Sequence, residues 1–94
     1  MLKHIVLFKL KDPACAEKCR ELILSMKGTV GQIRELEVGI DVLHTDRSFD
    51  IVLIVIVDDE EGLRGYAEHP YHVDVVKKYM MQVSEKSVIA DYII

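Results

Sequence analysis

The sequence contains no apolar stretch long enough to cross a membrane. Its longest clear apolar run covers residues 51–57, whereas a membrane helix needs about 18 or more consecutive apolar residues. The first four residues, MLKH, do not form the pattern of a secretory signal. We therefore expect a soluble protein that resides in the cytoplasm and has no membrane partner.

Cysteine is scarce, since the chain has two, Cys15 and Cys19. On a predicted helix they point along the same face without favouring disulfide geometry, and a reducing compartment suits them. No CxxC or HxxxH pair supplies further soft ligands at short spacing. We interpret both cysteines as free thiols and predict no structural metal.

Long basic runs are also missing. Twelve Lys and Arg against sixteen Asp and Glu give a formal net charge of −4, and the longest basic run is the Lys77-Lys78 pair. A surface that binds a phosphate backbone gathers positive charge on one face. The interspersed charges therefore argue against nucleic acid as a partner.

No repeat, low-complexity tract or Pro/Gly/Ser linker divides the chain, so residues 1–94 are predicted to form one domain. Four segments show strand patterns. Residues 2–10 are rich in Ile, Val, Leu and Phe, residues 34–43 alternate apolar and polar, and residues 87–94 close the chain. Within the segment 49–57, residues 51–57 are all apolar without alternation, which indicates a strand buried on both faces.

The first helix is predicted to begin at Asp12, as N-cap, and Pro13, and to close at Lys27 and Gly28. Its apolar stripe comprises Cys15, Cys19, Leu22, Ile23 and Met26. A short helix should follow the acidic cluster 58–61 and break at His69, because a residue before proline leaves the α region. A restart at Pro70 is predicted, with an apolar stripe of Val73, Val76, Met80 and Val83.

The order β-α-β-β-α-β defines an α+β class, the ferredoxin-like arrangement of a four-stranded antiparallel sheet with helices on one face. The non-alternating strand would then expose Ile and Val side chains on the other face. A second copy packed sheet against sheet covers this patch, so the sequence predicts a two-fold homodimer.

Several segments carry a resemblance to a known family. They are LKHIVLFKLKD at residues 2–12, YAEHPYHV at 66–73, EVG at 37–39 with Asp41, Phe49-Asp50, and VIADY at 88–92. Together they resemble the stress-responsive dimeric α/β-barrel (Dabb) domain family along the whole chain. The resemblance implies a dimeric ferredoxin-like barrel. Members include plant stress-associated proteins and a plant polyketide cyclase in which a tyrosine and a histidine do acid/base work, and related dimeric barrels include monooxygenases.

Tyr66, His72 and His4 are the candidate site residues. His72 is the third residue of the restarted helix, where the helix dipole favours a neutral imidazole, the form that a general base requires. The resemblance makes His72 the base and Tyr66 the group that orients a carbonyl or donates a proton. His4 shares a strand side with apolar residues and is expected on the pocket wall.

Each candidate also has a structural interpretation, since a buried Tyr or His commonly just finds a hydrogen-bond partner. His69 and Pro70 are interpreted as structural, with His69 as an N-cap. Where the cyclase-like pattern has a further histidine, this chain has Ile51. Asp91 is expected to pair with Arg34 or a backbone amide and has no catalytic role assigned.

The sequence thus predicts that the homodimer binds a small apolar or aromatic molecule in a pocket between sheet and helices, with Tyr66 and His72 as an acid/base pair. A non-catalytic stress-associated or structural dimer is the alternative, and a relative of the barrel monooxygenases a second one. Nothing in the sequence indicates a cofactor. Enzyme activity stays open; if present, the resemblance implies a polyketide cyclase-like lyase or a cofactor-free monooxygenase-like enzyme.

Overall fold

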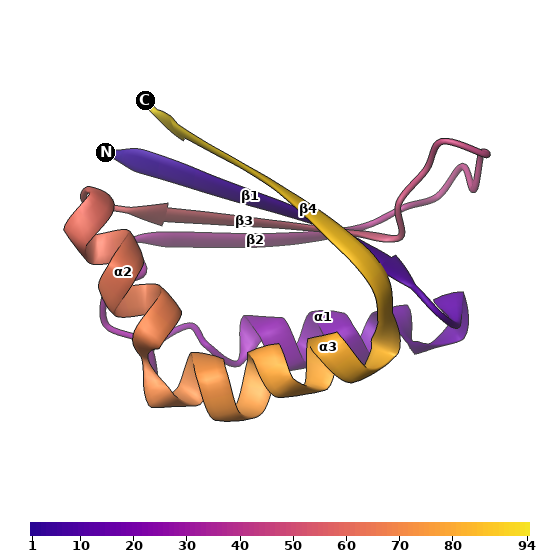
Figure 1. Cartoon of the computed structure of the whole chain (residues 1–94), viewed down its shortest axis with the longest axis horizontal. Helices are drawn as coiled ribbons and strands as arrows, with labels where there is room; N and C mark the ends of the chain where they lie inside the picture. Colours follow the sequence, from indigo (N-terminus) through magenta and orange to yellow (C-terminus); the bar gives the residue numbers. More distant parts are fainter.

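The computed structural model describes residues 1–94 and shows one sheet with helices on one of its faces (Figure 1). The elements, in chain order, are β1 (Leu2–Leu10), a 3₁₀ turn η1 (Pro13–Cys15), α1 (Ala16–Leu24), β2 (Glu35–Ile40), β3 (Ile51–Val57), α2 (Glu60–Glu68), a π-helical segment η2 (His72–Lys77), α3 (Lys78–Val83) and β4 (Ser84–Ile93). This order confirms the predicted ferredoxin-like βαββαβ fold. None of its helices has the length and apolar character that a membrane crossing requires.

The sheet is antiparallel throughout, with the strand order β2-β3-β1-β4. The two ends of the chain lie side by side (Figure 1), and the Ile94 amide donates a hydrogen bond to the Met1 carbonyl at 2.9 Å. Successive residues of a strand point to opposite faces. His4 and Val6 therefore face the helices, whereas Lys3 and Ile5 lie on the other side, called here the outer face.

The strand β3 behaves as its uniform apolar run predicts. Val55 and Val57 are fully buried toward the helices, within a core that includes Ile23, Met26 and Tyr66. Its alternate residues lie on the outer face and cross-pair with outer-face residues of β1 and β2: Val52, Ile54 and Ile56. Both sides of β3 are thus apolar, as the absence of alternation indicated.

The first helical segment confirms the predicted start at Asp12, whose carboxylate accepts a hydrogen bond from the Ala14 amide at 3.0 Å. Cys19, Ile23 and Met26 of the predicted stripe are fully buried. The sulfur atoms of Cys15 and Cys19 are 4.0 Å apart and both thiols are free. Burial raises the pKa of the Cys19 thiol to about 12.

Several predicted boundaries were wrong. The strand predicted as 49–57 begins at Ile51, and the first helix, predicted to close at Lys27 and Gly28, ends at Leu24. The segment predicted as 34–43 leaves the sheet after Ile40. The chain turns there, because the Asp41 carboxylate accepts a hydrogen bond from the His44 amide at 2.7 Å and His44 adopts a positive φ of 52°. The following apolar pair, Val42 and Leu43, is consequently 81% and 77% exposed. The last strand begins at Ser84 instead of residue 87, since β4 continues its pairing with β1 across a register shift.

The second helical segment breaks at His69, which has an extended backbone (φ −59°, ψ 132°), and helical structure resumes at Pro70. The resumed helix then passes through the π-helical segment η2, where hydrogen bonds span five residues. Val76 and Met80 are buried as predicted, but Val73 is 39% exposed. Tyr71, five residues before Val76, packs against the core instead, because the wider turn shifts the buried face.

Candidate functional site

A cavity of about 330 Å³ lies on the helix-facing side of the sheet, under the second helical segment. Its apolar walls come from β1, β3 and the helix that precedes β4: Val6, Phe8, Leu53, Val76 and Met80. Three predicted site residues, His4, Tyr66 and His72, line this same cavity. The fold therefore brings His4 to the same cavity as Tyr66 and His72, which follow it by more than 60 residues.

Tyr66 lies near the end of α2 and is only 1% exposed. Its hydroxyl oxygen is buried and has no hydrogen-bond partner within the chain. Burial raises the pKa of the Tyr66 phenol, since the charged phenolate is poorly solvated there. At neutral pH Tyr66 thus carries its proton and can donate it in a hydrogen bond.

The His72 ring lies against Tyr66, with ring centres 4.6 Å apart and planes inclined at 43°. The Nδ1 atom of His72 is 2.9 Å from the Ala67 carbonyl oxygen. Because a carbonyl can only accept, this contact assigns the ring hydrogen to Nδ1 and leaves Nε2 as an acceptor.

The pKa of His72 is lowered from its ordinary value. Burial is the main cause, the hydrogen bond to Ala67 opposes it, and the charges of Lys77, His4 and His69 lower it further. The position of His72 near a helix start predicted a neutral imidazole through the helix dipole, and burial provides a further cause of the same sign. His72 is neutral near pH 7 and has the acceptor nitrogen of a base.

His4 lies across the cavity, with its ring centre 5.9 Å from that of Tyr66. Its Nδ1 atom is 2.5 Å from the Asp91 carboxylate, which faces it from β4. The predicted partner of Asp91, Arg34 or a backbone amide, is therefore wrong. Arg34 instead donates two hydrogen bonds of 2.9 Å to the carboxylate of Asp58, the residue that follows β3.

Sequence reasoning missed Ser84 and the orienting role of Asp91. Ser84 lines the cavity, and its hydroxyl, like that of Tyr66, is buried and has no partner in the chain. A serine just before a predicted strand carries no special signal. For Asp91 there was a signal, because the strand pattern places it on the same side as Ile89 and Ile93. The register that brings Asp91 opposite His4 could not be predicted from that pattern.

His69 and Pro70 lie outside the cavity, at the helix break. The Nδ1 atom of His69 accepts a hydrogen bond from the Tyr71 amide at 3.1 Å, which satisfies a free donor at the start of the resumed helix. No three His, Cys, Asp or Glu side chains gather closely enough to hold a metal ion.

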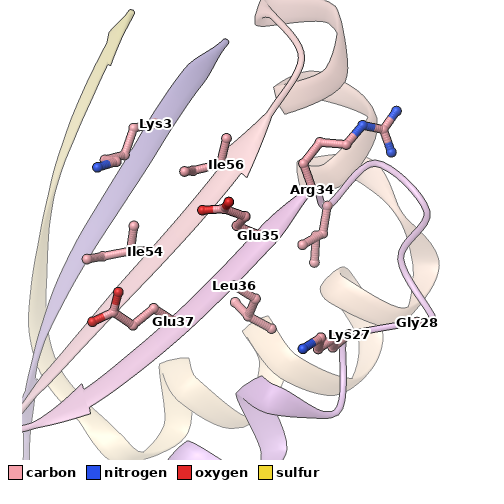
Figure 2. Close-up of a pocket in the computed structure, with 10 residues that line it drawn as sticks. Lys3, Lys27, Gly28, Arg34, Glu35, Leu36, Glu37, Ile54 and Ile56 are labelled. Atoms are coloured by element: carbon pink, nitrogen blue, oxygen red, sulfur yellow. The ribbon is translucent and has the colours of Figure 1, made fainter. Parts of the chain in front are cut away.

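A second hollow, of about 510 Å³, lies beside β2 on the outer face. Figure 2 shows Ile54 and Ile56 of β3 there, with Lys3 on one side and Glu35 and Glu37 on the other. It contains none of the predicted site residues and has no neighbouring acid/base pair. The first cavity is therefore the candidate site.

The fold and this cavity define a ferredoxin-like α+β domain with a small-molecule-sized chamber between sheet and helices. Among known families, the model described as "Stress responsive A/B Barrel Domain" (Dabb) matches residues 2–94. The chain belongs to this family.

Three similar proteins illustrate the range of the family and its fold. A stress-response A/B barrel domain-containing protein of Arabidopsis thaliana is 32% identical over 96 residues, which cover 99% of this chain but 36% of the relative. The chain thus spans about a third of that relative's length.

The other two are solved structures. A dimeric protein of unknown function with a ferredoxin-like fold from Bacteroides fragilis has a TM-score of 0.85 and 29% identity, covering 99% of this chain and 95% of that one. A hydroxynitrile lyase from Passiflora edulis has a TM-score of 0.82 and 18% identity, covering 99% and 92%. At that identity the likeness to the lyase shows the fold alone.

Proposed function

We propose that this protein is a homodimer that binds a small apolar or aromatic molecule in the cavity and that Tyr66 and His72 act on it as an acid/base pair. One observation carries the proposal. A buried phenol without a partner lies against a neutral histidine in a largely apolar cavity. Convergent polar groups in such a cavity are the usual mark of a small-molecule site.

The two unpartnered hydroxyls support a ligand more than a purely structural role. A buried polar group without a partner costs about 1–3 kcal/mol. Phe in place of Tyr66 and Ala in place of Ser84 would avoid that cost. A bound molecule with a carbonyl or hydroxyl group supplies the missing partner.

The chemistry follows from the protonation states. Nε2 of His72 accepts a proton from a carbon next to a carbonyl, while the Tyr66 hydroxyl donates a hydrogen bond to the carbonyl oxygen. The Nδ1 hydrogen bond to Ala67 holds the ring in the required tautomer. A hydroxynitrile lyase has the same fold, so we include hydroxynitriles in the ligand screen.

The outer face supports the homodimer. It presents an apolar surface from the three strands β3, β1 and β4, which no helix of the chain covers: Ile5, Leu7, Val52, Ile54, Ile56, Val88 and Tyr92. A second copy packed on this face hides it and leaves the cavity, on the opposite side of the sheet, free for a ligand. The related Bacteroides fragilis protein is dimeric. The free thiols suit our proposal that the dimer resides in the cytoplasm.

The test is a thermal-shift screen of aromatic and polyketide-like compounds against the wild type and the substitutions His72→Asn and Tyr66→Phe. Asn keeps a donor for Ala67 but removes the Nε2 acceptor. We expect compounds that stabilise the wild type and are weakened by either change. His44→Asn is the matched control, because His44 is exposed in the 41–48 loop and Asn tolerates its positive φ. A screen without wild-type-selective compounds would count against the proposal.

A non-catalytic dimer is the second candidate, favoured by the contacts of His69 and His72 with the backbone at the helix break. Under this alternative, His72→Ala lowers stability by about 1–3 kcal/mol, as for a lost buried hydrogen bond. No ligand affinity or activity changes beyond that loss. Loss of ligand binding at unchanged stability in His72→Asn separates the two candidates.

A further inference from the structure

The cavity has a charge opposite to that of the chain. The protein carries sixteen acidic and twelve basic residues, yet no Asp or Glu lines the cavity, whereas Lys77 and Lys86 do. Charges of one sign at the opening of a low-dielectric cavity act together on a charged ligand. The cavity is therefore biased toward an anion.

The π-helical segment η2 brings Lys77 to this opening. In an α-helix, residues five apart lie about 140° from one another around the axis. Hydrogen bonds that span five residues stack Lys77 over His72 instead, since η2 runs from one to the other. The charge of Lys77 does reach His72, where it lowers the pKa of the imidazole.

Lys77 is also the cation that is free to meet a ligand. It forms none of the ion pairs of the chain. The ammonium group of Lys86, by contrast, lies 5.5 Å from the centre of the Phe49 ring. Of the two lysines at the cavity, Lys77 alone thus has an uncommitted charge.

We infer that the ligand of this cavity is an apolar or aromatic compound that carries a carboxylate, with the carboxylate held at Lys77. The inference rests on the proposed function, since it assigns a charge to the ligand of the same site. A second polar group of that ligand then supplies a partner for the unpartnered hydroxyl of Tyr66 or Ser84, which line the same cavity. An aromatic or branched keto acid has this arrangement of groups.

Three probes that share a naphthalene ring test which ligand charge the cavity prefers: 2-naphthoate, 2-naphthylmethanol and 2-naphthylmethylammonium. Their affinities are measured by isothermal titration calorimetry at low and high salt. We expect the carboxylate to bind roughly five- to tenfold more tightly than the alcohol at low salt, as for one partly exposed ion pair, and the ammonium to bind most weakly. The advantage of the carboxylate should shrink in high salt.

Lys77→Met should reduce the affinity for naphthoate to that for the alcohol and leave the alcohol unchanged. Lys78→Met is the matched control, because Lys78 is adjacent, exposed and absent from the cavity lining, and it should change neither affinity. Equal affinities for carboxylate and alcohol in the wild type, or an equal loss in both variants, would overturn the inference while leaving the cavity a binding site. Failure of all three probes to bind would overturn the proposed function with it.

Discussion

His4 and Asp91 face each other across the β1–β4 pair, and their side chains meet at 2.5 Å on the helix-facing side of the sheet. They are 87 residues apart, near opposite ends of the chain. The Asp91 carboxylate fixes the direction of the His4 ring, whose centre lies 5.9 Å from that of Tyr66. Asp91, His4, Tyr66 and His72 thus form one continuous row, in which the last three residues line the cavity and Asp91 lies behind His4.

Removing the Asp91 charge should loosen this row. We expect Asp91→Asn to lower the free energy of unfolding by about 0.5–1.5 kcal/mol, the usual net value of one hydrogen bond, and more than Asp46→Asn in the exposed loop. Urea denaturation followed by circular dichroism measures both. Equal stability of the two variants would mean that the contact with His4 contributes nothing in solution.

Stability should depend on pH through His72. Its pKa is lower in the folded protein than the roughly 6.5 of an unfolded chain, so the unfolded state binds more protons as the pH falls below that value. The stabilisation is complete above about pH 6.5 and declines as the pH falls toward the folded-state pKa. Denaturation of the wild type and His72→Asn across this range should show a shallower decline in the variant. If stability fell equally steeply with pH in the wild type and in His72→Asn, the prediction would be contradicted. It would also be contradicted if the control His44→Asn showed the same shallower decline as His72→Asn.

Tyr66→Phe should separate stability from binding. Since the hydroxyl has no partner in the chain, its removal should leave stability unchanged or raise it by up to about 1 kcal/mol, while ligand binding weakens. Tyr71→Phe is the contrast, because the Tyr71 hydroxyl forms a 2.6 Å hydrogen bond with Ser25 and its loss should be destabilising. Chemical denaturation together with ligand titration tests both variants, and a clear loss of stability in Tyr66→Phe would point to a hidden partner.

A single introduced charge can test whether the outer face is the dimer interface. Ile54→Lys places an ammonium group in the middle of the apolar surface, and we expect the molecular mass in light scattering to fall from dimer to monomer. Val42→Lys, a change at an 81% exposed loop position, should leave the dimer intact. A dimer that survives Ile54→Lys would show that the copies pack through another surface.

Much of the fold could be predicted because local pattern and tertiary structure agree. The uniform apolar run 51–57 predicted β3 and its two buried sides, and the His69-Pro70 step predicted the helix break. The end of β2 and the start of β4 were harder to predict from the sequence. They depend on a side-chain contact of Asp41 and on pairing with β1. Neither contact produces a periodic pattern of apolar residues in the sequence.

The site was predictable in its residue types but not in its electrostatics. Tyr66 and His72 were visible in the Tyr-x-x-His-Pro-x-His segment, and the structure brings them together with His4. The partner of Asp91 depended on the register between two distant strands. The place of Lys77 depended on a π-helical turn, which periodicity analysis based on 3.6 residues per turn does not reveal.

Cys15 at the end of η1 and Cys19 in α1 provide a way to measure how often the first helix opens. Cys15 is partly exposed, while Cys19 is fully buried and its pKa of about 12 keeps it protonated and unreactive. A thiol reagent therefore labels Cys15 in the native protein, but modifies Cys19 only in molecules whose first helix has lifted from the sheet. In a Cys15→Ser background, the labelling rate of Cys19 reports the free energy of that opening, and a ligand that tightens the whole domain should slow it.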